Sequence, residues 1–228
     1  MRLRQGRMEE ETVYSSSPAE VAKRWKGAGA EWIHVVDLDG AVAGSPMNVE
    51  AVREIRRAVD IPLQLGGGIR DLGGIEEWLA VGIERVILGT AATEDPSVIK
   101  EACRRYPGRI AVGIDARGGE VMIRGWLTAT SRRTVDLAKE MEGYGVAVII
   151  ITDINRDGVG GGINLVQAHE VAEAVNTPLI VSGGIGSLED IRAVKELSPL
   201  GVEGVITGRA LYEGAVDLAE AIKVAKGD

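Results

Sequence analysis

Short apolar runs rich in Val and Ile recur along the chain, separated by longer and more polar stretches. The runs are continuous rather than alternating, which is typical of parallel strands buried on both faces. We therefore expect a parallel sheet built from these runs. They are Trp32–Leu38, Pro62–Leu65, Arg85–Leu88, Ile110–Ile114, Val146–Ile151, Leu179–Val181 and Gly204–Ile206.

Amphipathic helical patterns lie between the runs, and capping residues stand where several of them begin. Asn48 and Asp71 each precede an apolar stripe with helical spacing and are predicted N-caps. Ser187 and Asp190 form a near capping box, with Asp in place of the usual Glu. Pro18–Gly29 is the first predicted helix. Strand and helix alternate over most of the chain, which favours a parallel α/β fold.

An internal repeat distinguishes an open sheet from a barrel. Val59–Ile69 aligns with Val175–Ile185 at an offset of 116 residues, with six of eleven positions identical. Asp37 falls on Asp153 at the same offset. Two halves of four strand–helix units make eight, the number that closes a (β/α)8 TIM barrel. We expect residues 1–228 to form a single barrel domain.

The same repeat leaves one strand without a counterpart. The run that ends at Asp115 would correspond to a first-half strand 116 residues earlier, before residue 1. Met1–Tyr14 is then predicted to be the loop that follows a missing first strand. A barrel without that strand is open between its second and eighth strands, and exposed edges invite pairing. We expect self-association through these edges, or local disorder at the gap.

Composition excludes several classes of function. The formal net charge of −8 argues against a nucleic-acid binder, which needs a basic field. The single Cys103, an ordinary helix residue, excludes a disulfide framework and suits a reducing cytoplasm. His34, expected in the core, and His169, expected on the surface, are too few for a metal cluster. No apolar run approaches a membrane span, so we expect a soluble cytoplasmic protein.

Glycine-rich turns follow two pairs of predicted strands that the repeat relates. Gly lets the backbone approach an anion, and a helix N-terminus offers N–H groups to it. Two such pockets across one barrel mouth predict a substrate with a phosphate at each end, although the glycines could serve only the sharp turns. The residues are Gly67, Gly68, Gly89 and Thr90 in the first half, and Ser182, Gly183, Gly184, Gly208 and Arg209 in the second.

Carboxyl groups stand at or just after the ends of predicted strands, at the barrel mouth. Asp115 and Asp157 are candidates for general acid and base, with Thr152 able to bond a reacting carboxyl. The alternatives are that Asp115 caps a turn, that Asp153 only bonds backbone, and that Thr152 is a plain strand residue.

A predicted hairpin follows the fifth barrel strand and contains an Arg-Gly-Trp triplet. Arg124 could pair with a phosphate or carboxylate, and Trp126 could stack on a planar ring. Simple packing within the hairpin is the alternative for both residues.

Several longer motifs carry a resemblance to a known family. Over nearly the whole chain the sequence resembles the ProFAR (phosphoribosylformimino-aminoimidazole carboxamide ribotide) isomerases of histidine biosynthesis. It is more distantly similar to the cyclase subunit of imidazole glycerol phosphate synthase. The motifs are Val35–Ala41, Leu65–Asp71, Ile87–Ala92, Val112–Gly119, Thr152–Gly158, Ser182–Ile191 and Gly201–Gly214.

The resemblance implies an Amadori rearrangement of a bisphosphorylated aminoaldose to an aminoketose, with no cofactor and no metal. It implies that an Asp on the first strand is the base. Asp115 is implied as the acid, with Asp157 as a rival and Thr152 in support. The resemblance also places Arg2 among the substrate-binding residues. The triplet containing Arg124 and Trp126 resembles bifunctional relatives that also isomerise phosphoribosyl anthranilate.

Two departures from the family pattern shape the expected activity. The first strand and its Asp are absent from the sequence as numbered, which a start site placed too late or a deliberate truncation would explain. We expect little or no isomerase activity from the chain as numbered. The glycine-rich Val159–Ile163 stands where relatives have a Thr-Leu-Ser-Gly-Pro-like stretch, which predicts a more mobile loop. A cyclase-like enzyme and a non-catalytic or engineered phosphosugar-binding barrel remain alternatives.

Overall fold

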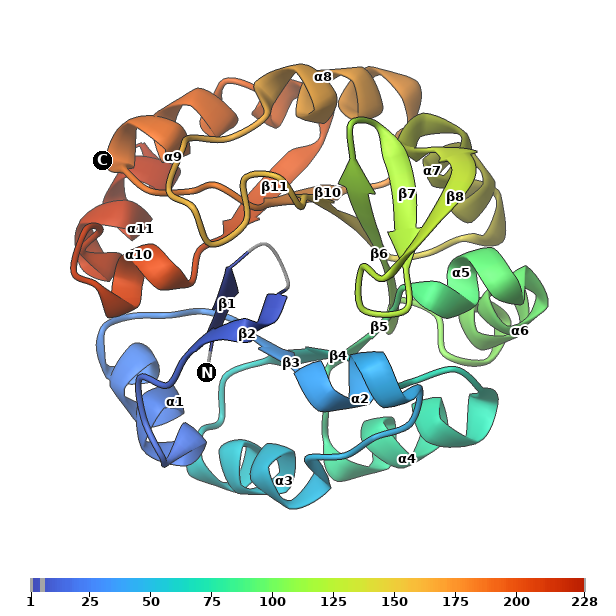
Figure 1. Cartoon of the computed structure of the whole chain (residues 1–228), viewed down its shortest axis with the longest axis horizontal. Helices are drawn as coiled ribbons and strands as arrows, with labels where there is room; N and C mark the ends of the chain where they lie inside the picture. The colour runs from blue at the N-terminus through green and yellow to red at the C-terminus, as the bar shows by residue number, and fades with distance from the viewer. Residues whose placement is uncertain (1, 5–6, 228) are drawn as a thin grey trace.

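The computed structural model describes residues 2–4 and 7–227, with side chains from residue 12 onward. Seven parallel strands lie in chain order and curl into a ring that the helices surround (Figure 1). This confirms the parallel α/β fold and is consistent with the predicted barrel family. The strands are β3 (Ile33–Val36), β4 (Leu63–Gly66), β5 (Arg85–Leu88), β6 (Ile110–Arg117), β9 (Val148–Asp153), β10 (Leu179–Ser182) and β11 (Val202–Ile206).

The main core lies between the strands and the outer helices, while a small cluster around Ile87 and Ile150 lies inside the ring. The longer helices are α1 (Pro18–Gly27), α3 (Val49–Ala58), α4 (Leu72–Val81), α6 (Pro96–Arg105), α7 (Thr134–Tyr144), α8 (Leu165–Ala174), α9 (Leu188–Lys195) and α11 (Leu218–Lys226). The shorter ones are α2 (Leu38–Ala43), α5 (Thr90–Glu94), α10 (Arg209–Tyr212) and the 3-10 turn η1 (Ser198–Leu200).

Two of the three predicted helix caps are confirmed. Asp71 accepts a hydrogen bond from the Gly74 N–H at 2.8 Å, and Ser187 and Asp190 form a complete capping box. The prediction for Asn48 is wrong in its chemistry. Asn48 stands at the N-cap position of α3, but its side chain makes no capping bond and turns toward the preceding loop instead.

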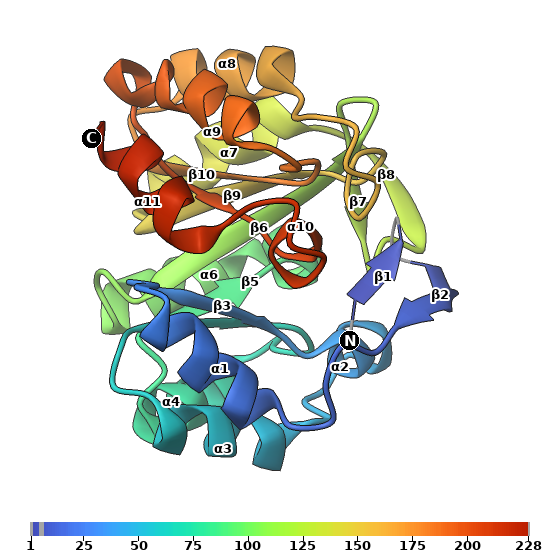
Figure 2. The same cartoon turned by 90° about the vertical axis from the view of Figure 1, so that its left-hand side faces the viewer.

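Two hairpins stand on the side of the ring where the parallel strands end, called the mouth below (Figure 2). The first, β1 (Arg2–Arg4) with β2 (Arg7–Thr12), is antiparallel. The prediction of a plain loop over Met1–Tyr14 is therefore wrong for these residues. The second hairpin, β7 (Glu120–Ile123) with β8 (Thr128–Arg133), is also antiparallel, and β7 pairs with the end of β6, which runs two residues beyond Asp115. This confirms the predicted hairpin.

The ring has one seam. β3 and β11 are the two ends of the strand order, and in the part of the chain that the structure describes they form no ladder with each other. The inner strands β4 and β9 are buried throughout, whereas β3 is only half-buried and Val36 at its end is 40% exposed.

Among the described residues, no helix is long and apolar enough to cross a membrane.

Candidate active site at the barrel mouth

A cavity of about 1060 Å³ opens at the mouth and continues into the ring. It brings together residues from both halves of the predicted site. They are Gly67, Gly68, Gly89, Thr90, Arg124 and Trp126 from the first half and the hairpin, with Asp115, Thr152, Asp157 and Ser182 from the second half.

Three polar side chains stand in one row across neighbouring strands. Asp115 on β6 is level with Thr152 on β9, and Thr152 is level with Ser182 on β10. Neighbouring strands lie about 4.8 Å apart, so residues in register on the same face are adjacent. The strand register therefore places a carboxyl group and two hydroxyl groups side by side under the cavity.

Asp115 has the environment of a carboxyl group that resists ionisation. Desolvation by burial raises its pKa above the usual value, and hydrogen bonds from Trp126 and Thr152 only partly oppose that effect. The Trp126 Nε1 donates to Asp115 Oδ2 at 2.7 Å. This bond makes Trp126 part of the site rather than simple hairpin packing. A raised pKa in a cleft is the property expected of a general acid.

Asp157 lies on the loop after β9, at the border of the mouth cavity and a smaller one of about 210 Å³. Its backbone N–H donates to the Asp153 carbonyl at 3.1 Å, which holds the turn in place. The smaller cavity is lined by the predicted second-half phosphate residues. These are Ser182, Gly183, Gly184, Gly208 and Arg209.

Arg209 is held by groups close to the smaller cavity. Its Nε donates to Glu213 at 2.7 Å, and its Nη1 donates to the Gly158 carbonyl. The hydroxyl of Tyr14 also donates to Glu213, at 3.0 Å. The Arg209 guanidinium is therefore fixed beside this cavity by contacts with two loops.

The first-half loops meet the β7–β8 hairpin at the other side of the mouth. Thr90 Oγ1 accepts a hydrogen bond from the Arg124 backbone at 2.9 Å, and the Arg124 side chain pairs with Glu94 at 2.7 Å. Arg124 and Trp126 both have positive φ, at 56° and 69°, which is strained for residues with a Cβ. The side chain of Arg2 lies outside the described residues.

The paired glycines have a direct packing role in both halves. A Cβ on Gly67 would lie 2.2 Å from the Asp37 carbonyl oxygen, and a Cβ on Gly183 would lie 2.6 Å from the Asp153 carbonyl oxygen. Both residues also have positive φ, at 104° and 87°. Each glycine turn must pass closely over the loop of the preceding strand, so the repeat preserves glycine for packing whether or not a phosphate binds.

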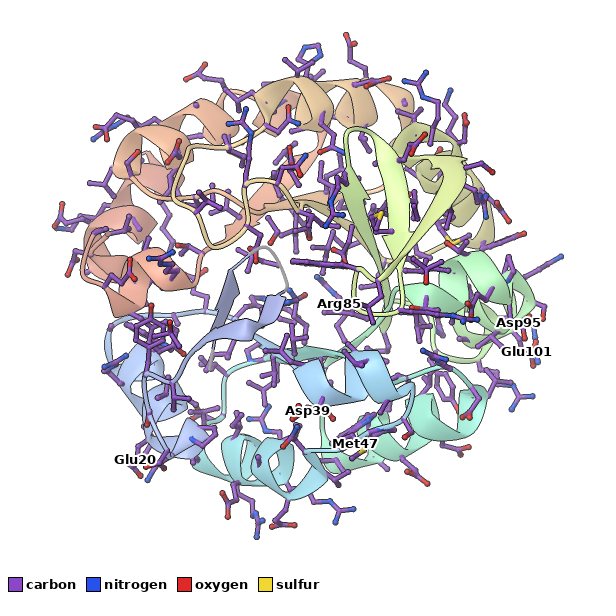
Figure 3. The ribbon with its side chains drawn as sticks, viewed as in Figure 1. Glu20, Asp39, Met47, Arg85, Asp95 and Glu101 are labelled. Carbon is purple, nitrogen blue, oxygen red and sulfur yellow. The ribbon has the colours of Figure 1, made fainter. Side chains whose placement is uncertain are left out.

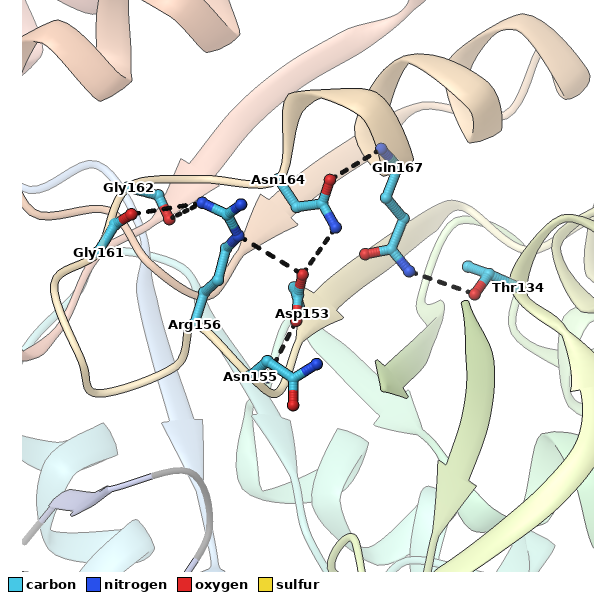
Figure 4. A network of polar contacts seen from close by, with 8 residues as sticks. All are labelled: Thr134, Asp153, Asn155, Arg156, Gly161, Gly162, Asn164 and Gln167. Carbon is cyan, nitrogen blue, oxygen red and sulfur yellow. Dashed lines mark hydrogen bonds and ion pairs between the residues drawn. The ribbon is translucent and has the colours of Figure 1, made fainter. Parts of the chain in front are cut away.

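Asp37 and Asp153 are held in equivalent ways by their own loops. Asp153 accepts a hydrogen bond from the Asn155 N–H at 2.9 Å and one from Asn164 Nδ2 at 2.7 Å (Figure 4). Asp37 accepts a hydrogen bond from Asn48 Nδ2 at 2.8 Å, and 116 residues separate Asn48 from Asn164 as they separate the two aspartates. These carboxylates accept hydrogen bonds that organise their own loops.

Sequence reasoning did not single out two arginines that line the cavity, Arg70 and Arg85. Gly44, with a φ of 79°, lets the Arg70 guanidinium pack against its backbone, because a Cβ there would lie 2.6 Å from Arg70 Cζ. Arg85 lies inside the ring (Figure 3), stacked 4.7 Å from the centre of the Trp32 ring. Burial lowers its pKa. Arg70 could have been found from the sequence, because it is the arginine of the Leu65–Asp71 motif.

Among the residues that the structure describes, no three His, Cys, Asp or Glu side chains are grouped as a metal site. His34 lines the ring interior and its Nδ1 lies 3.0 Å from Gln64 Nε2, while His169 is on the surface as expected.

The curled parallel sheet and the polar groups at its carboxyl end define a TIM-barrel type of protein with an active-site-like mouth. The family model described as histidine biosynthesis protein matches residues 1–217. The chain belongs to this family.

Relatives in several bacteria match almost the whole chain. One from Syntrophotalea carbinolica is 54% identical over 227 residues, which cover 100% of this chain and 93% of the relative. One from Rhodospirillum rubrum is 55% identical, over 98% of this chain and 93% of the relative. A third, from Geobacter sulfurreducens, is 52% identical over 99% and 93%. All three are named 1-(5-phosphoribosyl)-5-((5-phosphoribosylamino)methylideneamino) imidazole-4-carboxamide isomerase.

Proposed function

We propose that this site catalyses the Amadori rearrangement of ProFAR, the bisphosphorylated aminoaldose, to its aminoketose in histidine biosynthesis. The observation that carries the proposal is the position of Asp115, a carboxyl group with a raised pKa in the mouth cavity that the first-half glycines also line, near the smaller cavity lined by the second-half glycines. The isomerase names of the relatives support the same reaction. Family membership supports the pathway.

Asp115 is the proposed general acid. An acid must give a proton to the ring oxygen of the aminoaldose, so that the ring opens and a protonated imine forms at C1′. A carboxyl group with a raised pKa stays protonated at pH values closer to neutral than an ordinary Asp does. Thr152 and Trp126 bond the Asp115 carboxyl and orient it. Asp157, on the loop after β9, is the rival for this role.

The second proton transfer needs a base that removes the C2′ proton of the imine and leaves an enolamine, which tautomerises to the ketone. We propose that a carboxylate at the mouth end of a first strand supplies this base. That strand would occupy the seam between β3 and β11.

The two pockets are proposed to hold the two substrate phosphates. Their separation across the mouth suits an extended substrate whose reacting sugar lies over Asp115. Arg209 would face one phosphate, and Arg70 or Arg124 the other. Backbone N–H groups of the glycine turns would add neutral donors, which an acidic protein can offer to an anion without a basic surface.

The test is to measure binding and turnover separately. Calorimetry with the aminoketose product should detect binding by the chain, and Arg209→Ala should weaken it at least about tenfold by removing a charged contact. The matched control is Arg192→Ala, because Arg192 pairs with Glu189 on the exposed face of α9. Failure of the unaltered chain to bind product up to about 1 mM would contradict the proposed site.

A second substrate, phosphoribosyl anthranilate, is favoured by one observation. Trp126 stands at the mouth on a strained hairpin tip, where its flat indole could move from Asp115 and stack on an aromatic ring. If this is correct, Trp126→Ala should weaken binding of the anthranilate substrate more than binding of the ProFAR product. Equal losses would contradict it.

A further inference from the structure

A chain of polar contacts joins Tyr14 to the loop after β9. The Tyr14 hydroxyl donates to Glu213 Oε1 at 3.0 Å, and Arg209 Nε donates to the same carboxylate oxygen at 2.7 Å. Arg209 Nη1 in turn donates to the Gly158 carbonyl. Three separate segments therefore meet at one guanidinium. They are the segment before α1, the helix α10 with the residue after it, and the loop after β9.

The ring of Tyr14 is held by a second set of contacts. It stacks on Tyr212, with 4.7 Å between the ring centres and 21° between the ring planes. Trp25 of α1 meets the Tyr212 ring edge-on at 5.4 Å, where α1 lies beside α10 (Figure 1). Aromatic pairs in these geometries stabilise a structure beyond the area that they bury. The ring contacts therefore restrict where the Tyr14 hydroxyl can lie.

The protonation states in this chain of contacts suit the bonds. Burial and the bond to Glu213 raise the pKa of the Tyr14 hydroxyl, although the nearby Arg209 opposes them. The bonds from Arg209 and Tyr14 lower the pKa of Glu213. At neutral pH the hydroxyl is therefore a donor and Glu213 is a charged acceptor, which makes both bonds to this carboxylate charge-assisted.

The guanidinium that these contacts hold still has donors to offer. Arginine carries five N–H groups, and the bonds to Glu213 and Gly158 use Nε and Nη1. Arg209 also lines the smaller cavity together with the Gly183–Gly184 turn. A long side chain loses rotamer freedom when it binds a ligand, and a side chain that is fixed beforehand loses less. Holding Arg209 in place should therefore strengthen its contact with an anion in this cavity.

We propose that Glu213, held by Tyr14, is a positioning residue that fixes Arg209 at the smaller cavity for a substrate phosphate. The inference rests on the proposed function, in which Arg209 faces that phosphate. Tyr14 and Glu213 act through Arg209. The competing hypothesis is that the Glu213 carboxylate neutralises Arg209 and competes with the phosphate for it. The two hypotheses predict opposite changes in affinity when Glu213 is replaced.

The test measures binding of the aminoketose product by calorimetry. Tyr14→Phe keeps the stacked ring and removes the hydroxyl, and it should weaken binding about threefold. Glu213→Ala should weaken binding about fivefold, less than Arg209→Ala does. Glu213→Gln should stay within about twofold of the parent chain, because its amide oxygen can accept both bonds. This rescue by Gln separates the position of Arg209 from the charge beside it.

The chain offers a matched control for each substitution. Tyr144 donates to Glu140 at 3.0 Å, and Glu140 pairs with Arg132, so Tyr144→Phe removes an equivalent hydroxyl bond. Glu101 pairs with Arg105 Nε at 2.6 Å, also four residues apart, so Glu101→Ala removes an equivalent ion pair. Neither Tyr144 nor Glu101 lines the two cavities described above. Both controls should leave product binding unchanged.

Melting temperatures separate positioning from a general effect on the fold. The side chains of Arg209 and Glu213 are 42% and 41% exposed, and such ion pairs contribute little to stability. Glu213→Ala and Tyr14→Phe should therefore melt within about 3 °C of the parent chain. A double-mutant cycle supplies the second criterion. In an Arg209→Ala background, neither Glu213→Ala nor Tyr14→Phe should weaken product binding further.

Four results would overturn the inference. They are tighter binding by Glu213→Ala and Glu213→Gln, losses that add to that of Arg209→Ala, losses that track the melting temperature, and no loss in Glu213→Ala and Tyr14→Phe. If Arg209→Ala weakens binding while these last two variants do not, only the positioning role fails. If Arg209→Ala also binds product like the parent chain, the proposed phosphate contact of Arg209 fails as well.

Discussion

Replacement of Asp37 by Ala tests whether the first-half loop aspartate is structural. Its carboxylate is buried, with 4% of the residue exposed. It accepts hydrogen bonds from the backbone N–H groups of Gly40 at 2.9 Å, Met47 at 2.7 Å and Asn48 at 3.0 Å. The Asn48 side chain adds a fourth bond at 2.8 Å. The substitution would leave all these donors without their acceptor.

The magnitude follows from the number of donors. A net hydrogen bond contributes about 1 kcal/mol and one to a charged group contributes more, so the three backbone donors alone give about 3 kcal/mol. For a domain of this size, that free energy corresponds to a fall in melting temperature of roughly 6–12 °C. The effect should depend on pH. Burial raises the pKa of Asp37, but the hydrogen bonds from Asn48, Gly40 and Met47 outweigh it and lower the net value. The stabilisation is therefore full above the unfolded pKa and is lost as pH falls through the folded pKa.

Urea unfolding of the parent chain and Asp37→Ala at neutral pH and at acid pH measures both effects. Asp39→Ala is the matched control, because Asp39 is exposed and accepts a hydrogen bond from the Asn48 side chain at 2.8 Å. We expect the control to change the free energy of unfolding by less than about 0.5 kcal/mol. A loss below about 1 kcal/mol in Asp37→Ala, or a loss that does not shrink in acid, would refute the structural assignment.

Three further predictions concern the site. Asp115→Asn should lower isomerase turnover by at least about a hundredfold. It should leave stability near pH 8 unchanged or higher, because the raised pKa means that ionisation of Asp115 destabilises the fold as pH rises; a large loss of stability would contradict this. Gly183→Ala should destabilise by more than about 2 kcal/mol, because a Cβ meets the Asp153 backbone at 2.6 Å with φ at 87°. Gly145→Ala, with φ at 80° and open space, isolates the φ effect and should cost about 1 kcal/mol in the same unfolding assay. Trp126→Phe removes a hydrogen bond that lowers the pKa of Asp115, so the basic limb of the pH–rate profile should move to higher pH; no movement would remove Trp126 from the acid's environment.

Local patterning was sufficient to predict most of the scaffold. Continuous apolar runs predicted all seven parallel strands to within a few residues, because strands buried on both faces carry apolar side chains at nearly every position. The pair Ser187 and Asp190 predicted a helix start, since capping is a contact between residues three apart. The 116-residue repeat predicted which loops occupy equivalent places, because the two halves of the chain share the same order of strands and turns.

Contacts between distant segments were beyond the sequence. Asn48 has the residue type of a cap, yet its amide bonds Asp37, eleven residues earlier in the chain. The glycine spacing predicts phosphate binding or sharp turns, but it does not predict the backbone loops packed over Gly67 and Gly183, which also require glycine there. The bond from Trp126 to Asp115 depends on how the hairpin folds over β6, which no local pattern specifies.

Asp115 is proposed to give the proton that opens the ring of the aminoaldose, with Asp157 as its rival. The most direct test is ProFAR turnover by the parent chain, by Asp115→Asn and by Asp157→Asn. We predict that Asp115→Asn loses at least about a hundredfold of the parent turnover and that Asp157→Asn keeps most of it. A loss confined to Asp157→Asn would contradict the assignment and would make Asp157 the acid.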